Sequence, residues 1–111
     1  MVIKKEASKG YENAEPIIIQ GHLDMVWQKD TDCTKDLERE GIDLYIDGDF
    51  IRAKGTTLGA DNGIAVAMAM AILADDTLSH PKIEAVFTTD EEVGMLGAKE
   101  LDVNVLSAKK M

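Results

Sequence analysis

The sequence predicts an α/β fold, and three segments carry that prediction. Residues 16–20 (Pro-Ile-Ile-Ile-Gln) form a continuous β-branched run, which is typical of a strand buried on both faces in a parallel or mixed sheet. Residues 83–87 predict a second strand, and between the two lies an alanine- and methionine-rich segment from Asp61 to Asp75 with helical composition. A helix between two such strands is the order expected of an α/β protein.

Local signals predict the elements around this frame. Residues 2–5 (Val-Ile-Lys-Lys) predict a short strand with one charged face, and the polar residues 8–15 predict a surface loop. Residues 30–41 are highly charged and predict a loop or a frayed helical turn. Residues 43–46 and 50–53 flank an Asp-Gly-Asp sequence, which predicts a β-hairpin because the glycine readily adopts the positive φ of the turn.

The segment from Asp61 to Asp75 predicts the principal helix of the chain. Asp61 and Asn62 are favourable residues at a helix N-terminus. Because the segment is apolar on nearly every face, we expect the helix to be buried on several sides. After the second strand, residues 98–106 predict a short helix and its exit. The Ser-His-Pro sequence before that strand predicts a turn with His80 at the surface.

Composition and charge exclude several classes of protein. The 111 residues include 12 Lys and Arg against 21 Asp and Glu, which gives a net charge of −9. A protein that binds a phosphate backbone normally has the opposite excess, so we expect no nucleic-acid partner. The longest apolar run, residues 64–74, is too short to cross a bilayer, so we expect no membrane partner. The single cysteine, Cys33, cannot form an internal disulfide, which favours a cytoplasmic location.

Three polar clusters lie where predicted elements begin or end. His22 and Asp24 follow the first buried strand, Asp61 opens the helix, and Glu91 and Glu92 follow the second buried strand. Because the ends of parallel neighbours meet at one edge of a sheet, the clusters can converge in space. One histidine with several carboxylates is a suitable ligand set for zinc or manganese. Two adjacent glutamates can divide the work, one binding metal and the other transferring a proton.

Each cluster also has a purely structural interpretation. His22 can be a hydrogen-bonded histidine at a strand end, and the two glutamates can belong to a solvated acidic loop. Asp61 can be an N-cap, worth about 1 kcal/mol to the helix. These interpretations explain each cluster alone, but they do not explain why all three lie at the ends of elements.

Three motifs occur in order along the chain. They are residues 21–26 (Gly-His-Leu-Asp-Met-Val), residues 55–63 (Gly-Thr-Thr-Leu-Gly-Ala-Asp-Asn-Gly) and residues 88–98 (Thr-Thr-Asp-Glu-Glu-Val-Gly-Met-Leu-Gly-Ala). Together they resemble the metal motifs of the dinuclear zinc peptidases of the M20 family. The Asp-Gly-Asp hairpin and residues 73–76 match as well, and the resemblance is strongest to the bacterial aminoacyl-histidine (Xaa-His, β-alanyl-histidine) dipeptidase branch.

This resemblance implies a role for each candidate residue. His22 is expected to ligate one zinc ion, Asp24 to orient its imidazole, and Asp61 to bridge two zinc ions. Glu91 is expected to be the general base and Glu92 a ligand of the second zinc, with manganese or cobalt as possible substitutes. The peptide bond between Asp61 and Asn62 is expected to be cis. The implied fold is the mixed-sheet, phosphorylase/hydrolase-like catalytic domain of the zinc exopeptidases.

The resemblance also implies ligands and domains that this sequence does not contain. The family's site has a further aspartate well after the Glu-Glu pair and a histidine far downstream, and Asp102 is too close to Glu92 to be that aspartate. We therefore expect residues 1–111 to be the N-terminal portion of a catalytic domain, without the lid or dimerisation domain and without a complete active site. The parent is expected to be a homodimer that hydrolyses dipeptides. The uncovered apolar surface, including part of the helix over residues 64–73, favours self-association of this chain.

Two other functions remain open at this point. The acidic clusters would also serve a non-catalytic cation-binding or interaction domain. Another activity of the same family, tripeptide hydrolysis or amino-acid deacylation, uses the same motifs. Cys33 has no histidine near it in sequence and lies in an acidic loop, so we expect it to have no catalytic role.

Overall fold

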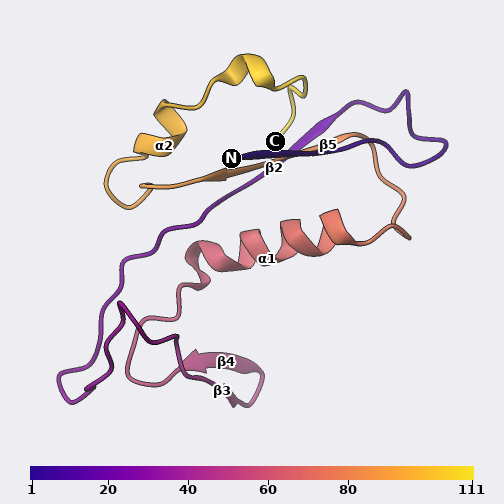
Figure 1. Ribbon diagram of the computed structural model, residues 1–111. Helices are drawn as coiled ribbons and strands as arrows, with labels where there is room; N and C mark the ends of the chain where they lie inside the picture. The colour runs from indigo at the N-terminus through magenta and orange to yellow at the C-terminus, as the bar shows by residue number, and fades with distance from the viewer.

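The computed structural model describes all 111 residues and contains a three-stranded mixed sheet with one long helix against one face (Figure 1). The strands are β1 (Val2–Lys5), β2 (Ile17–His22) and β5 (Ile83–Thr88), in the order β1-β5-β2. Strand β1 is antiparallel to β5, and β2 is parallel to it. The predicted α/β class is confirmed.

Strand β5 is the centre of the fold, and all six of its residues are buried. Its side chains alternate between two faces, as the pleat of a strand requires. Ala85 and Phe87 pack with Ala69 of helix α1 (Ala60–Ala74) in a small core, which the half-buried Ile19, Val66 and Leu73 extend. Glu84 faces the other side, where helix α2 (Leu96–Lys99) and the C-terminal residues lie.

Strand β2 runs two residues further than predicted, so that His22 is the last residue of the strand rather than the start of a loop. Gly21 makes this close approach possible, because a Cβ at this position would lie 3.1 Å from the Cβ of Ala65 in α1. The strand is half-buried at Ile17 to Ile19 rather than covered on both faces. At its free edge, β2 pairs only with Lys110, through an isolated parallel bridge at Ile17.

Helix α1 confirms the predicted helix with a shift of one residue at each end. Asp61 and Asn62 have non-helical φ and ψ angles, and the peptide bond between them is cis, as the family resemblance implied. The expectation that the helix is buried on several sides is wrong for this chain, because only one face contacts the sheet. Ile64, Met68 and Met70 are about 60% exposed, so the expected uncovered apolar surface is present.

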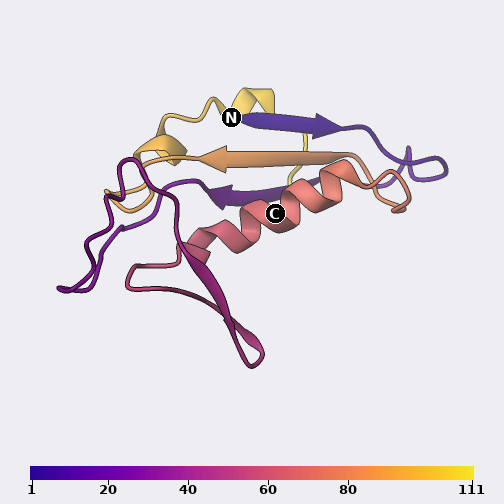
Figure 2. The ribbon, with the colours of Figure 1, turned by 60° about the horizontal axis from the view of Figure 1, so that its bottom comes forward.

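The predicted hairpin is formed by β3 (Leu44–Asp47) and β4 (Phe50–Ala53), with Gly48 at a φ of 60°. It stands away from the three-stranded sheet as a separate ribbon (Figure 2). Near the C-terminus, α2 and a 3₁₀ turn (Val103–Val105) replace the single helix predicted over residues 98–106. The break lies at Asp102, whose carboxylate accepts a hydrogen bond from the Asn104 N–H. No helix combines the length and the apolar character needed to cross a membrane.

His80 was predicted at the surface, and this is wrong. The residue is buried, because hydrogen bonds between Ser8 and His80 join the loop after β1 to the loop before β5. The His80 N–H donates to Oγ of Ser8 at 2.8 Å, and the Ser8 N–H donates to the His80 carbonyl at 3.0 Å. The ring nitrogen Nδ1 lies 2.7 Å from the Pro81 carbonyl oxygen. His80 therefore has a structural role, at the end of β5 opposite to the polar clusters.

Candidate metal centre

The three polar clusters meet at one end of the sheet. In the parallel pairing of β2 and β5, His22 lies opposite Thr88, so both strands end at the same edge. Glu91 and Glu92 follow β5 in the next turn, and Asp61 lies at the start of α1. This is the edge at which open α/β sheets bind ligands.

His22, Glu91 and Glu92 form a group that can hold a metal ion. One ligand atom from each of the three lies within 4.8 Å of the others, with His22 buried, Glu91 half-buried and Glu92 exposed. Asp61 is outside this group, but its Oδ1 lies 3.1 Å from Nε2 of His22. Oε2 of Glu91 lies 4.0 Å from the same nitrogen. The structure thus brings together the four residues that were predicted to bind metal or act as base.

The His22 ring is held between acceptors on both sides. Nδ1 lies 2.8 Å from the main-chain oxygen of Asp24, and because a carbonyl only accepts, Nδ1 must donate. Nε2 is then directed at the carboxylates of Asp61 and Glu91. Burial lowers the pKa of His22, but the Asp24 carbonyl and the surrounding carboxylates outweigh it, so the pKa is raised from its ordinary value.

This donor set fits a divalent cation. The ion pairs of Asp61 and Glu91 involve only His22, so the negative charge of the three carboxylates here is left largely uncompensated. A cation would relieve their repulsion and occupy the position that faces Nε2 of His22. Imidazole nitrogen and carboxylate oxygen are ligands that zinc accepts, and a ligating histidine commonly donates its other N–H to a carbonyl, as Nδ1 does here.

Asp24 contacts both His22 and Glu92. Its main-chain oxygen bonds the His22 ring, whereas Oδ2 of its side chain accepts the Glu92 N–H at 3.1 Å. Oδ1 is buried without a hydrogen-bond partner and lies 3.7 Å from Nδ1 of His22. Burial raises the pKa of Asp24, but the N–H groups of Glu92 and Glu91 and the nearby His22 outweigh it, so the pKa is lowered.

The turn that carries the two glutamates is tightly constrained. Asp90 and Met95 have left-handed φ angles of 56° and 58°. The N–H groups of Gly94 and Met95 both donate to the Glu91 carbonyl. Gly97 closes the turn against Thr89, and a Cβ at Gly97 would lie 2.3 Å from the Thr89 oxygen. Strained conformations of this kind cluster at functional sites.

A cavity of about 560 Å³ opens beside the metal group, between the sheet and α2. Its polar end is formed by His22, Asp61 and Glu91, and its apolar wall includes Leu101 and Leu106. No pattern in the sequence predicts these two leucines at the site, because only the return of the C-terminal segment over the sheet places them there.

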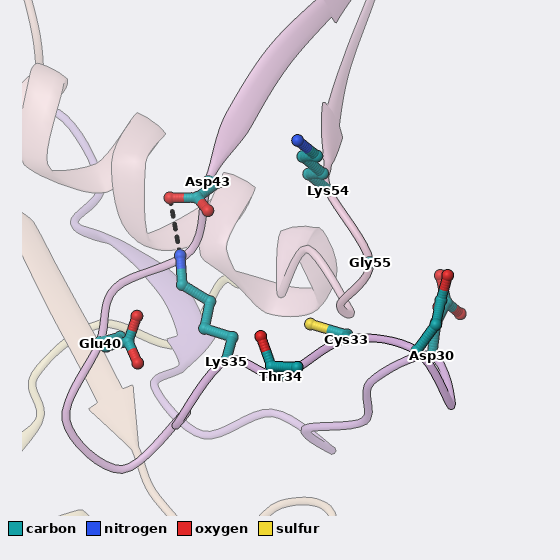
Figure 3. Close-up of a pocket in the computed structure, with 9 residues that line it drawn as sticks. Asp30, Cys33, Thr34, Lys35, Glu40, Asp43, Lys54 and Gly55 are labelled. Carbon is teal, nitrogen blue, oxygen red and sulfur yellow. Dashed lines mark ion pairs between the residues drawn. The ribbon is translucent and has the colours of Figure 1, made fainter.

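A second cavity, of about 510 Å³, lies between the loop of residues 30–43 and the end of β4 (Figure 3). Its wall includes Cys33, and across it Lys35 forms an ion pair of 2.6 Å with Asp43. The hydrogen bond and charge of Lys35 lower the pKa of Asp43. No histidine lines this cavity, and its carboxylates do not form a metal group.

Comparisons with known proteins agree with this geometry. Residues 18–110 match the family described as Peptidase family M20/M25/M40. The chain is 48% identical over 108 residues to the cytosol non-specific dipeptidase of Escherichia coli, a match that covers 97% of this chain and 22% of the relative. Among solved structures, the aminoacylhistidine dipeptidase of Vibrio alginolyticus is similar with a TM-score of 0.92 and 47% identity, over 96% of this chain and 22% of that one. The aminopeptidase PepT of Bacillus cereus is similar with a TM-score of 0.72 and 30% identity, over 97% of this chain and 27% of that one.

These comparisons confirm the family resemblance and the metallopeptidase fold predicted from the motifs. The matched residues 18–110 include the metal group of His22, Glu91 and Glu92, and they also include Asp61. The chain spans about a fifth of the length of the first dipeptidases it matches. Peptidases of this family are metal-dependent, in agreement with the donor set described above. The chain belongs to peptidase family M20/M25/M40.

Proposed function

We propose that the protein that carries this chain is a metal-dependent dipeptidase, and that residues 1–111 are the N-terminal portion of its metal-binding catalytic domain. The observation that carries this proposal is the group of His22, Glu91 and Glu92 at the carboxyl edge of the sheet. The dipeptidases among the similar proteins support it. A cytoplasmic location is part of the proposal, supported by the name of the Escherichia coli relative.

The residues at the site divide into metal ligands and a proton carrier. His22 and Glu92 would be ligands of different ions, and Asp61 would be shared between the two sites. Two zinc ions, when bound, would polarise the scissile carbonyl and make water more acidic. Glu91 is half-buried and its carboxylate reaches towards His22, so it can take a proton from the attacking water and return a proton to the leaving amine.

Dipeptides of the Xaa-His type are the proposed substrates. The similar protein of Vibrio alginolyticus is an aminoacylhistidine dipeptidase, which supports this choice. Tripeptide hydrolysis is the second candidate, because a tripeptidase of Staphylococcus aureus is similar with a TM-score of 0.72, although at only 25% identity. Comparing turnover of a Xaa-His dipeptide with that of its one-residue extension separates the two candidates.

Substituting the two glutamates separately tests the proposed roles in the whole protein. Glu91→Gln should keep its metal and lose about 10²- to 10⁴-fold in kcat, because the base is removed but no ligand is lost. Glu92→Gln should lose metal as well as turnover. Metal content by mass spectrometry and turnover of a Xaa-His dipeptide provide both measurements.

The reverse pattern, with metal lost in Glu91→Gln and kept in Glu92→Gln, would show that the roles are misassigned. Metal bound by the unsubstituted protein with no hydrolysis of any di- or tripeptide would favour a non-catalytic cation-binding domain. Residues 1–111 alone should not hydrolyse dipeptides. With Asp61 shared, each ion would have only two protein ligands, His22 and Asp61 or Glu92 and Asp61, whereas catalytic zinc sites usually have three. Metal-dependent turnover by this chain, abolished by Glu91→Ala, would contradict that expectation.

A further inference from the structure

We propose that the Met25 side chain is a positioning group for Asp61: its thioether packs on Gly59 and so fixes where the Asp61 carboxylate lies relative to the His22 ring. This inference concerns the site of the proposed function and rests on it. Met25 is not itself a metal ligand, because it acts through the carboxylate that the two ions would share.

The contact between Met25 and Gly59 is close. Gly59 has a left-handed φ of 74° and lies directly before α1. A Cβ at this position would overlap Sδ of Met25, so the missing side chain leaves the space that the thioether fills. An unbranched thioether is well suited to such a narrow space. The other apolar side chains of residues 23–27 are at least 50% exposed, whereas Met25 is half-buried; they are Leu23, Val26 and Trp27.

The segment after β2 runs antiparallel to the segment before α1. The Thr57 N–H donates to the Gln28 carbonyl at 3.0 Å, and the Gln28 N–H donates to Oγ1 of Thr57 at 3.1 Å. Next to this pair, Lys29 and Thr56 form an isolated antiparallel bridge. Hydrogen bonds therefore hold the two segments together up to Gln28 and Thr57.

Between these hydrogen bonds and the metal group, the two segments meet through packing. No hydrogen bond joins residues 23–27 to residues 58–60. Met25 lies in the first of these stretches, three residues after His22, and Gly59 lies in the second. Their contact therefore joins the two segments where hydrogen bonds do not.

Asp61 depends on this contact because its own side chain has little support. The side chain is 90% exposed, and its only polar partner is Nε2 of His22, at 3.1 Å from Oδ1. Its position is therefore set by its backbone, which lies two residues after Gly59. The Gly59 carbonyl also accepts the Gly63 N–H at 3.0 Å, in a turn that contains Asp61. A displacement of Gly59 would move the Asp61 carboxylate away from the His22 ring.

Amide hydrogen exchange in the whole protein without metal tests the packing contact. Met25→Ala removes the thioether, so the Gly63 N–H should exchange with solvent several-fold faster. Met25→Leu keeps a similar volume and should retain most of the protection. The Asp75 N–H donates to the Ala71 carbonyl at the distant end of α1, and its exchange should not change. Met68→Ala is the matched control, because Met68 is 59% exposed on α1, and it should leave both amides unchanged.

A double-mutant cycle on zinc affinity, measured by competition with a chelator, tests whether Met25 acts through Asp61. Met25→Ala alone should weaken zinc binding about 10- to 100-fold, which is the usual effect of losing a residue that orients a ligand. In an Asp61→Ala background the same substitution should have almost no further effect, because the carboxylate that it positions is gone. Met25→Leu and Met68→Ala should bind zinc nearly as tightly as the unsubstituted protein.

Equal losses of zinc affinity with and without the Asp61 carboxylate would overturn the proposal, because Met25 would then act on the protein as a whole. Unchanged exchange of the Gly63 N–H in Met25→Ala would also overturn it. So would loss of the fold in both Met25 variants with Met68→Ala folded. If the unsubstituted protein binds no zinc, the proposed function fails, and the amide exchange still decides this inference.

Discussion

Replacing Glu84 with glutamine should destabilise the protein strongly at neutral pH and much less in acid. Glu84 is fully buried in the central strand β5, on the face opposite to α1. Its carboxylate accepts hydrogen bonds from the Ser107 N–H at 2.8 Å, the Ser107 hydroxyl at 2.9 Å and the Ala108 N–H at 2.9 Å. Nζ of Lys4 lies 3.2 Å away. The side chain therefore fastens β1 and the C-terminal segment to β5.

The size of the effect follows from the pKa of Glu84. Burial raises this pKa, but the donors of Ala108, Ser107 and Lys4 outweigh it and lower the pKa from 4.5 to about 2. This difference corresponds to about 3 kcal/mol in favour of the ionised form in the folded protein. Because the pKa is lowered on folding, the stabilisation is complete above pH 4.5 and is lost as the pH falls towards 2. About half of it should be gone at pH 3.

Urea unfolding followed by circular dichroism at pH 7 and pH 3 tests this reasoning. Glu84→Gln should lower the free energy of unfolding by about 3 kcal/mol at pH 7, and the difference from wild type should shrink by about half at pH 3. Glu38→Gln is the control, because Glu38 is exposed and its carboxylate forms no hydrogen bond or ion pair. An equal effect of Glu84→Gln at both pH values would refute the argument, since the loss would then come from packing rather than from charge.

Two further substitutions test how the ends of the principal elements are held. Lys5→Met should lower the free energy of unfolding by about 1 kcal/mol, because Nζ of Lys5 donates to three carbonyls at the C-terminus of α1, those of Ile72, Leu73 and Asp75. Lys9→Met is the control, and it should leave the free energy of unfolding unchanged because the Lys9 side chain is exposed. Gly97→Ala should cost about 1–3 kcal/mol and weaken metal binding, because its Cβ would collide with the Thr89 backbone. Gly63→Ala, a helical glycine with open space around it, should be neutral or stabilising. Equal urea midpoints for the two alanine variants would contradict the packing argument.

The elements that the sequence predicted well are those with a local physical signal. The β-branched residues 17–19, the Gly48 turn and the alanine-rich helix each depend on neighbouring residues, and all three elements form where they are predicted, although the strand and the helix are less buried than expected. The C-terminal helix was misplaced because its break at Asp102 depends on a competing side-chain hydrogen bond. Glu84 and His80 were not recognised as buried, because their partners, Ser107 and Ser8, come from distant parts of the chain.

The candidate site was predicted from motifs rather than from spacing. His22, Asp61, Glu91 and Glu92 lie far apart in sequence, and only the parallel pairing of β2 with β5 brings their ends together. The strand ends made this convergence plausible, and the family resemblance supplied the individual roles. Neither the strand ends nor the resemblance predicts that Asp24 contacts His22 through its main-chain oxygen and Glu92 through its side chain, because this depends on which oxygen lies nearer to each donor.

The two ends of the sheet differ in charge. Lysine contacts at one end stabilise the fold, and carboxylates without a lysine or arginine partner gather at the candidate metal site at the other end. At the end of β5 where Lys5 pairs with Ile83, lysine side chains bind a buried carboxylate and the carbonyls of a helix terminus. At the other end, three carboxylates gather around one histidine without a lysine or arginine partner. A cation bound at this second end would relieve the repulsion among these carboxylates. The contacts of Lys4 with Glu84 and of Lys5 with the C-terminus of α1 fasten β1 to β5 and to the helix. These contacts lie away from the acidic edge, so they can stabilise the fold whether or not that edge binds an ion.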